Sequence, residues 1–403
     1  MDNDLKEIIK KVKENGGKIY QVGGSVRDEI LGIQNNDEDY CITGLEEKEF
    51  ENIFPNALKL GKSFKVYNIN GKEIALARTE KKTKLGHKGF EVYTNKNIAI
   101  EQDLKRRDIT INSIAKDLYT NKYIDPFNGI KDIENRIIRA TSDAFCEDPL
   151  RVYRVARFSA TLDFFVDDTT INMMKKLRDE MIYISKERIF KEFDKAMKSK
   201  NPQNFFEVLY NADVLKVHFK EIYDLSKYKY KKENAFQYVI KILKNSVDLT
   251  DDENIRFAVL IICIGNIIEN NAILKLNLNN LAKRIGLPKK WIDCVNSAMM
   301  NIDKYINYNK LNILQKVDFL ENVYKSNIGF NGLKIICISN NCYNIEYNNI
   351  KFEKIAEEML RKIDGKYIIN KYNIKPDKLF KETLRKERAN WLENNIHGGR
   401  KYV

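Results

Sequence analysis

The sequence predicts an α+β protein, in which an amino-terminal mixed sheet with helices precedes a longer region that is almost entirely helical. Three observations support this fold class. Up to about Ala140, short runs rich in β-branched and aromatic residues alternate with helical segments. From Asp143 onward, apolar residues recur with the period of a helix. At 403 residues the chain also exceeds one ordinary core, so we expect more than one domain.

Five short apolar segments of the amino-terminal part are the predicted strands. They are KIYQV (18–22), DYCIT (39–43), FKVYNI (64–69), EIALAR (73–78) and FEVYT (90–94). Helical spacing over 25–31 predicts a helix directly after the first strand. Further along the chain, the same periodicity predicts helices over 149–162, 169–181, 186–197 and 202–215.

The composition favours an acidic partner. Lys and Arg number 70 against 57 Asp and Glu, so the formal net charge is +13 and nucleic acid is the obvious candidate. A basic surface that only aids solubility is the alternative. The six cysteines include no close Cys-x-x-Cys pair and no signal peptide is recognised, so we expect a reduced, cytoplasmic protein. The longest apolar stretch, 257–264, is too short to cross a bilayer, so we expect no membrane contact.

The turn after the first strand predicts a nucleotide site. Gly23-Gly24 makes a tight turn that bares backbone N–H groups, and Arg27 follows one turn into the helix, so both suit a triphosphate. Asp37 and Asp39 come next and lie two apart on a predicted strand, where side chains share one face. Two carboxylates on one face can hold Mg²⁺, the cofactor expected here.

Two further groups are candidates for the same site. Glu73 is a third catalytic carboxylate if the strand 73–78 lies beside the first pair, and a solvent-facing strand residue if it does not. Arg106-Arg107-Asp108 opens another apolar-periodic segment, and arginine forks suit phosphate oxygens or a ribose edge. A charged helix cap is the alternative for this triplet.

The segment Glu147-Asp148-Pro149-Leu150-Arg151 suggests a hypothesis about base choice. Asp148 before Pro149 is well placed as a helix N-cap, which alone would explain the pair. Asp148 and Arg151 are also neighbours on one helical face, where they present an acceptor beside a fork of donors. Cytosine and adenine offer an amine beside a ring-nitrogen acceptor, so this edge would accept C and A and refuse U and G. Arg154, one turn further, would add charge toward the phosphates.

Six motifs occur in order along the chain: VGGSVRDEILG, DEDYCITG, EIALARTEKK, DLKRRDITINSIAKD, DPFNGIKDIENRIIRA and EDPLRVYRVARFSA. Together they resemble the class II tRNA nucleotidyltransferases, and more narrowly the bacterial CCA-adding enzymes of the poly(A) polymerase family. The motifs cover about residues 18–160, and a weaker likeness extends to about residue 220.

The resemblance implies a polymerase-β-like head followed by an all-helical neck, body and tail. We expect these parts at 1–140, 141–200, 201–300 and 301–403, with the base-reading helix in the neck and tRNA binding in the tail. The implied activity is template-independent addition of C, C and A to tRNA 3′ ends from CTP and ATP, with release of pyrophosphate. The tRNA would be bound at its 3′ end and along the backbone of its acceptor stem and elbow.

The resemblance also implies roles for single residues. By motif, Asp37 and Asp39 would hold Mg²⁺. The residues expected to contact the nucleotide are Gly24, Arg27, Arg107, Asp108, Glu147, Asp148, Arg151 and Arg154.

The chain departs from its nearest relatives where a metal-dependent HD phosphohydrolase segment would be expected. In RFAVLIICIGNII, Ile262 and Cys263 stand in place of the adjacent His-Asp, and no histidine occurs between His218 and His397. We therefore expect no metal of the HD kind and no phosphohydrolase activity. The region is expected to be a helical scaffold that binds tRNA phosphates through Lys and Arg.

Two alternatives remain open. Poly(A) polymerases, and partial enzymes that add only CC or only A, share the head motifs and are poorly separated by sequence. The second alternative is a catalytically silent RNA-binding module. The acidic pair and the arginines argue against it, because a protein that only binds RNA has no need of metal ligands.

Overall fold

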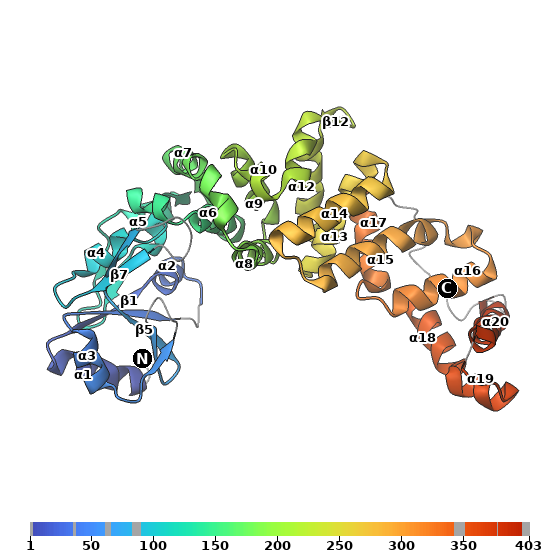
Figure 1. Ribbon diagram of the computed structural model, residues 1–403, viewed down its shortest axis with the longest axis horizontal. Helices are drawn as coiled ribbons and strands as arrows, with labels where there is room; N and C mark the ends of the chain where they lie inside the picture. Colours follow the sequence, from blue (N-terminus) through green and yellow to red (C-terminus); the bar gives the residue numbers. More distant parts are fainter. Residues whose placement is uncertain are drawn as a thin grey trace. The chain divides into compact units, whose positions relative to one another are not determined.

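The computed structural model describes residues 3–34, 38–60, 66–82, 90–341, 351–376 and 378–396. The chain divides into two compact units, Met1–His218 and Phe219–Val403. The first unit contains the large sheet, and the described part of the second consists of helices and one short hairpin (Figure 1). The predicted α+β architecture, a mixed sheet followed by a largely helical region, is confirmed. The finer division at residues 140, 200 and 300 stays a prediction.

The first unit begins with the elements of the sheet and its covering helices, and continues as helices with short connecting strands. In order they are α1 (Asn3–Glu14), β1 (Lys18–Val22), α2 (Gly24–Ile30), β2 (Asp39–Thr43), α3 (Glu47–Ile53), β3 (Leu58–Leu60), β4 (Val66–Ile69), β5 (Lys72–Leu76), β6 (Arg78–Lys82), β7 (Phe90–Thr94), α4 (Ile100–Lys105), β8 (Ala115–Asp117), β9 (Tyr123–Ile124), α5 (Gly129–Glu134), β10 (Ile137–Ile138), α6 (Leu150–Leu162), β11 (Phe165–Val166), α7 (Asp168–Lys176), α8 (Lys186–Met197), α9 (Pro202–Asn211) and α10 (Leu215–His218).

Seven strands form the central sheet in the order β3-β4-β5-β2-β1-β8-β9. Strands β2 and β5 run parallel, and their register pairs Asp39 with Glu73. The other neighbours in this sheet run antiparallel, so the sheet is mixed, as predicted. Strands β6 and β7 form a separate antiparallel ladder.

Helices cover both faces of this sheet because successive strand residues point to opposite sides. Ile19 of β1 lies in one buried core with Val12 of α1 and Phe50 of α3. Its neighbour Tyr20 lies in a second core with Leu104 of α4. Figure 1 shows α1 and α3 together on one side of the strands and α4 on the other. The two cores cover both faces of the sheet, and the carboxylates of the site lie at one end of its central strands β2 and β5.

Several predicted elements match the structure, and three differ for local reasons. The bounds of β1, β2, β7 and α8 are those predicted, and α6 begins one residue later than expected. The predicted strand 73–78 is interrupted: β5 ends at Leu76, and from Arg78 the chain forms β6, which pairs with β7. The predicted helix 169–181 ends at Lys176, and a 3₁₀ helix (Arg178–Tyr183) follows. The predicted helix 202–215 breaks because Asp213 adopts a left-handed φ of 53°.

The second unit is a stack of helices with a large apolar interior. Its elements are α11 (Lys220–Tyr223), β12 (Lys229–Tyr230), β13 (Glu233–Asn234), α12 (Ala235–Ser246), α13 (Glu253–Ile268), α14 (Asn271–Ile285), α15 (Lys289–Ile306), α16 (Ile313–Tyr324), α17 (Gly329–Ser339), α18 (Phe352–Lys362), α19 (Gly365–Tyr372) and α20 (Lys378–Ile396). Helix α13 packs against α12, α14, α15 and α17 and is its central element.

The residues that stand in place of an HD pair lie in this central helix. Ile262 and Cys263 are 6% and 1% exposed, so both belong to the apolar interior. The expectation that this region binds no metal and hydrolyses no phosphate ester stays a prediction. None of the helices in the described ranges combines the length and apolar character that a membrane span requires.

Candidate active site

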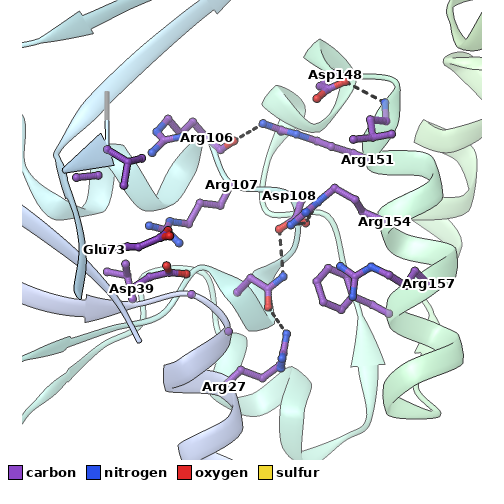
Figure 2. A pocket seen from close by; sticks show the side chains of 18 of the residues that line it. Arg27, Asp39, Glu73, Arg106, Arg107, Asp108, Asp148, Arg151, Arg154 and Arg157 are labelled. Carbon is purple, nitrogen blue, oxygen red and sulfur yellow. Dashed lines mark hydrogen bonds and ion pairs between the residues drawn. The ribbon is translucent and has the colours of Figure 1, made fainter. Parts of the chain in front are cut away.

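A cavity of about 610 Å³ in the first unit gathers most of the predicted site residues (Figure 2). Those lining it are Gly24, Arg27, Asp39, Glu73, Arg107, Asp108, Asp148, Arg151 and Arg154. Asp37 lies outside the described residues. Glu147 lines a neighbouring hollow together with Lys105 and Arg106 instead. Segments that are far apart in the sequence therefore meet at one cavity.

The acidic side of the cavity is built by two adjacent parallel strands. Asp39 opens β2, Glu73 is the second residue of β5, and the two are register partners, so their side chains emerge on the same face. Both side chains are exposed and reach the cavity (Figure 2). In the described ranges, no three His, Cys, Asp or Glu side chains cluster closely enough to hold a metal. These two carboxylates supply the hard oxygen ligands that Mg²⁺ prefers, and they fit part of such a site.

The glycine turn lies directly against this acidic side. Gly23 adopts φ 77° and ψ −137°, a backbone conformation that is essentially restricted to glycine. A Cβ atom at Gly23 would stand 3.0 Å from Nη1 of Arg107 and 3.8 Å from Oδ2 of Asp39. Glycine is therefore needed both for the turn and for the close approach of these two side chains. The predicted order of strand, turn and helix is confirmed.

A chain of hydrogen bonds crosses the cavity floor from α2 to α6 (Figure 2). Nη1 of Arg27 donates to Oδ1 of Asn112 at 2.7 Å, and Nδ2 of Asn112 donates to Oδ1 of Asp108 at 3.2 Å. Nε of Arg154 donates to Oδ2 of Asp108 at 2.7 Å. Asp108 thus holds the guanidinium of Arg154 in place, while a direct contact between Asp108 and a nucleotide stays a prediction.

The charge state of Asp108 follows from its neighbours. Burial by itself would raise the pKa of this carboxyl, because it disfavours the charged form. The positive charges of Arg154 and Arg151 and the hydrogen bonds of Arg154 and Asn112 outweigh burial and hold the pKa at about 2. Asp108 is therefore ionised at neutral pH, and its charge in turn raises the pKa of Arg154.

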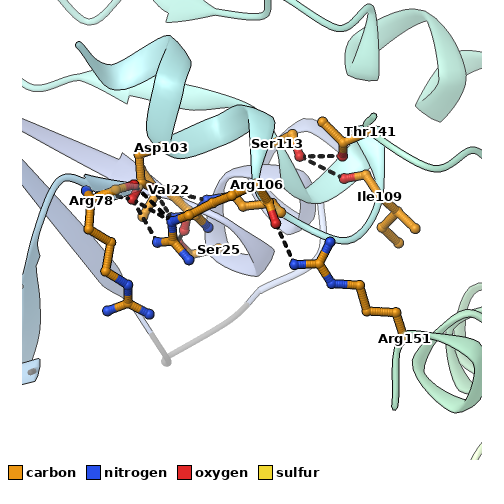
Figure 3. A network of polar contacts seen from close by, with 10 residues as sticks. Val22, Ser25, Arg78, Asp103, Arg106, Ile109, Ser113, Thr141 and Arg151 are labelled. Atoms are coloured by element: carbon orange, nitrogen blue, oxygen red, sulfur yellow. Dashed lines mark hydrogen bonds and ion pairs between the residues drawn. The ribbon is translucent and has the colours of Figure 1, made fainter. Parts of the chain in front are cut away.

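A second buried carboxylate organises the two arginines of the triplet (Figure 3). Oδ1 of Asp103 accepts hydrogen bonds from Nη2 of Arg106 at 2.6 Å and from the backbone N–H of Arg78 at 3.2 Å. Oδ2 of Asp103 accepts from Nη2 of Arg107 at 3.2 Å. Burial opposes ionisation, but the arginine charges hold the pKa of Asp103 below its usual value. This carboxylate lies in the middle of α4 and was not among the predicted site residues.

The predicted base-reading pair lines the cavity at the start of α6. Oδ1 of Asp148 accepts from the backbone N–H of Leu150 at 2.9 Å at the start of α6, although the N-cap of this helix falls on Pro149 and not on Asp148 as predicted. Oδ2 of Asp148 accepts from Nη2 of Arg188 at 2.9 Å. Arg151 donates through Nη1 to the carbonyl of Ala144 at 2.7 Å and through Nη2 to the carbonyl of Arg106 at 2.5 Å (Figure 3). Both side chains are fixed by the protein before any ligand binds.

The cavity also contains basic residues that were not predicted from the sequence. Arg157 follows Arg154 by three positions on α6, a helical spacing that could have identified it. Arg188 and Lys195 come from α8, and no local pattern marks either of them. Arg157 donates to Oε2 of Glu192 at 2.5 Å, and burial together with the charge of Arg157 lowers the pKa of Lys195.

The arrangement combines three chemical functions in one cavity. The acidic side can bind a divalent cation, and the arginines opposite can bind the oxygens of a triphosphate. The fixed acceptor of Asp148 and the donors of Arg151 offer a hydrogen-bonding edge of the kind a base presents. This combination suits a site that transfers a nucleotide better than one that only binds an anion.

Family models match two regions of the chain. Residues 19–139 match the poly A polymerase head domain, which spans the sheet and the acidic side of the cavity. Residues 163–225 match the probable RNA and SrmB-binding site of polymerase A.

Curated proteins match more of the chain. A CCA-adding enzyme of Buchnera aphidicola subsp. Acyrthosiphon pisum (strain Tuc7) is 36% identical over 75% of this chain and 79% of its own length. Another, from Buchnera aphidicola subsp. Cinara cedri (strain Cc), is 42% identical over 60% of this chain, and that match spans 61% of the relative's length.

Solved structures share the fold. The CCA-adding enzyme of Thermotoga maritima complexed with tRNA is similar over 98% of this chain and 93% of its own, with a TM-score of 0.65 and 21% sequence identity. At that identity the likeness concerns the fold alone.

Proposed function

The chain belongs to the CCA-adding enzymes of the poly(A) polymerase family, which are tRNA nucleotidyltransferases, and on this premise we propose how its own residues perform the reaction. The substrates are a tRNA that lacks its terminal CCA, CTP and ATP. The primer 3′-hydroxyl attacks the α-phosphorus of the nucleotide, and pyrophosphate leaves. One observation carries the proposal: the carboxylates Asp39 and Glu73 line the same cavity as the fixed pair Asp148 and Arg151.

Asp39 and Asp37 are the proposed Mg²⁺ ligands, with Glu73 as the third carboxylate of the catalytic set. Support for this comes from the register of Asp39 and Glu73 and from the hard oxygen donors they provide. Bound Mg²⁺ would neutralise phosphate charge and make the primer hydroxyl a better nucleophile. Asp39 and Glu73 would in addition help to orient that hydroxyl.

Arginines hold the triphosphate in this proposal. Arg107, at the glycine turn, and Arg154, fixed by Asp108, are the first candidates, since both guanidiniums line the cavity. Arg27 and the backbone of Gly24 complete the phosphate side. Charged hydrogen bonds of this kind are stronger than neutral ones.

Base choice belongs to Asp148 and Arg151. The Asp148 carboxylate accepts the exocyclic amine of cytosine or adenine, and Arg151 donates to the adjoining ring nitrogen. Uracil and guanine would put a carbonyl against that carboxylate, which forfeits a hydrogen bond and costs about 1–3 kcal/mol. Hydrogen bonds from Leu150 and Arg188 to Asp148 support this, because they fix the acceptor in one orientation.

The rest of the chain would serve the tRNA. We assign residues 1–140 to a catalytic head, 141–200 to a neck, 201–300 to a body and 301–403 to a tail that binds tRNA. The spacing of the cysteines in the sequence favours a reducing compartment, so the enzyme is placed in the cytoplasm.

An end-addition assay tests the proposal. The purified protein is incubated with tRNA that lacks its last three nucleotides, with Mg²⁺, and with each triphosphate singly or CTP and ATP together. We expect two added residues with CTP alone, three with both, and none when the divalent cation is removed with EDTA. A long tail with ATP alone would indicate a poly(A) polymerase, a stop after one or two residues with both triphosphates a partial enzyme, and no product a silent RNA-binding module.

A further inference from the structure

A short hairpin in the second unit has an unusual turn. Strands β12 and β13 pair antiparallel, with Tyr230 opposite Glu233, and are joined by two residues, Lys231 and Lys232. Both lysines have left-handed φ values, 48° and 70°. Positive φ at both central positions is the signature of a type I′ turn, for which Asn-Gly is strongly preferred. Lysine carries a Cβ that disfavours this region, so two lysines here lower stability relative to Asn-Gly.

The hairpin is nevertheless fixed in position. The rings of Tyr230 and Tyr238 pack edge to face with centroids 5.0 Å apart, which attaches β12 to α12. Nζ of Lys231 lies 5.4 Å from the centroids of both rings and 3.3 Å from the hydroxyl of Tyr238. Oδ1 of Asn234 accepts from the backbone N–H of Phe236 at 3.0 Å. The strained turn is therefore presented rigidly.

The exposed face of the hairpin carries positive charge beside an aromatic ring. We call residues 227–232 the lysine hairpin. Lys227 is paired with Asp224, whereas Lys229 and Lys232 are exposed and form no ion pair with any residue the structure describes. Tyr228 between them is 60% exposed. One carboxylate, that of Glu233, lies in the adjoining strand, so the amines of Lys229, Lys231 and Lys232 leave a positive excess.

We propose that the lysine hairpin contacts tRNA, with Lys231 and Lys232 of the turn and Lys229 beside them near backbone phosphates, and the Tyr228 ring against a ribose or base. Amines supply the sequence-independent, salt-dependent part of RNA binding, and exposed aromatic rings stack on nucleotides. The lysines keep the turn despite the strain because their charge is needed at that position. The inference rests on the proposed function, since it names one part of the surface that binds the tRNA substrate.

Two double variants at the turn separate this role from a structural one. K231N/K232G installs the residues that a type I′ turn prefers and removes two charges. K231R/K232R keeps the charge and the strain. Asn-Gly relieves the strain of the turn, but K231N also removes the contacts of Lys231 with Tyr230 and Tyr238, so we expect a melting temperature close to that of the wild type. Any loss of tRNA binding in a variant that melts with the wild type then comes from charge and not from misfolding.

The measurement is the Kd for tRNA lacking CCA, determined by filter binding over a range of salt concentrations. Each lost phosphate contact should lower the slope of log K against log salt by about 0.9, so K231N/K232G should lose about 1–2 in slope and bind roughly tenfold or more weakly near 0.1 M salt. K231R/K232R should stay close to the wild type. A K231N/K232G protein with wild-type Kd and slope would overturn the inference.

Steady-state kinetics distinguish a failure of the hairpin inference from a failure of the proposed function. In K231N/K232G the KM for tRNA should rise with its Kd, while the KM for CTP stays at the wild-type value. If the wild type adds CMP but the variant keeps the wild-type KM for tRNA, only the hairpin inference fails. If the wild type itself adds no nucleotide, the proposed function fails, whatever the variant binds.

Discussion

Asp39 and Glu73 are register partners on the parallel strands β2 and β5, and both carboxylates reach one cavity. A parallel pair places the two side chains on the same face of the sheet. The glycine turn approaches Asp39 from the other side, and a Cβ at Gly23 would press on the guanidinium of Arg107 at 3.0 Å. The proposed catalytic centre is therefore assembled by backbone topology, and its acidic groups are held by the sheet.

Removing either carboxylate should abolish nucleotide addition. Asp39→Asn and Glu73→Gln keep the shape of the side chain but each removes one negative charge from the proposed catalytic carboxylates, so we expect kcat to fall by at least about 10²–10³-fold. Glu101→Gln, an exposed carboxyl on α4, serves as the matched control. In all three variants, Asp39→Asn, Glu73→Gln and the control, the Kd for tRNA should stay at the wild-type value. Turnover of Asp39→Asn near the wild-type rate would rule out its role as a metal ligand.

The sequence predicts local elements well because their signals are local. Alternation and helical spacing are enough to predict β1, β2, β7 and α8 with the observed bounds. Strands β3, β8 and β9 have two or three residues each, too few for any period to be recognised. The break at Asp213 was missed as well, because a single left-handed residue leaves no periodic signal.

Residues of the site could be predicted where they belong to motifs, and not where they come from partners distant in the chain. Glu73 could be named only on the condition that its strand lay beside Asp39, because a sequence does not state strand order. Arg188 contacts Asp148 across 40 positions of the chain, and Asp103 is buried under two arginines. Both depend on tertiary packing.

Arg188 should increase the preference for CTP over UTP without contacting the base itself. Its ion pair with Asp148 fixes the acceptor, so Arg188→Gln should leave the carboxylate free to rotate and lower the CTP to UTP preference by about 3–10-fold, the equivalent of one hydrogen bond. Lys191→Gln on the same helix is the control. The ratio of kcat/KM for CTP and UTP is the measurement. A preference that stays at the wild-type value would mean that Asp148 is oriented by Leu150 alone.

Asp108 should make the first unit sensitive to acid. Its pKa is about 2 in the folded protein and about 3.8 in the unfolded chain, so its contribution is complete above pH 4 and is lost as pH falls toward 2. Asp108→Asn should therefore lower the free energy of unfolding by on the order of 2 kcal/mol at neutral pH. This difference from the wild type should shrink as the pH falls below ~4.

Urea unfolding of both proteins across this pH range provides the test of the Asp108 account. Asp179→Asn, at a highly exposed carboxyl, is the control and should not lower the free energy of unfolding in a pH-dependent way. A gap between Asp108→Asn and wild type that stays constant down to pH 2 would show that Asp108 contributes by packing and not by its charge.

Gly23→Ala should impair both stability and nucleotide binding. The backbone conformation at Gly23 costs an alanine about 1–3 kcal/mol, and the new Cβ would press on Arg107. Gly32→Ala is matched, because its φ is also positive at 69° but nothing lies within 4 Å of an added Cβ. We expect both variants to melt earlier, and only Gly23→Ala to raise the KM for CTP. An equal rise in the KM for CTP in both variants would contradict a specific role for the turn.

Base choice by protein side chains is the central claim, and Asp148→Asn tests it most directly. An asparagine amide can donate to the carbonyl of uracil, which the carboxylate cannot do. The quantity to measure is the ratio of kcat/KM for UTP to that for CTP on tRNA lacking CCA. We predict that this ratio rises about 10–100-fold over the wild type, corresponding to about 1.4–2.7 kcal/mol of altered pairing. A ratio that is the same in Asp148→Asn and wild type would contradict the account, because some other group would then be reading the base.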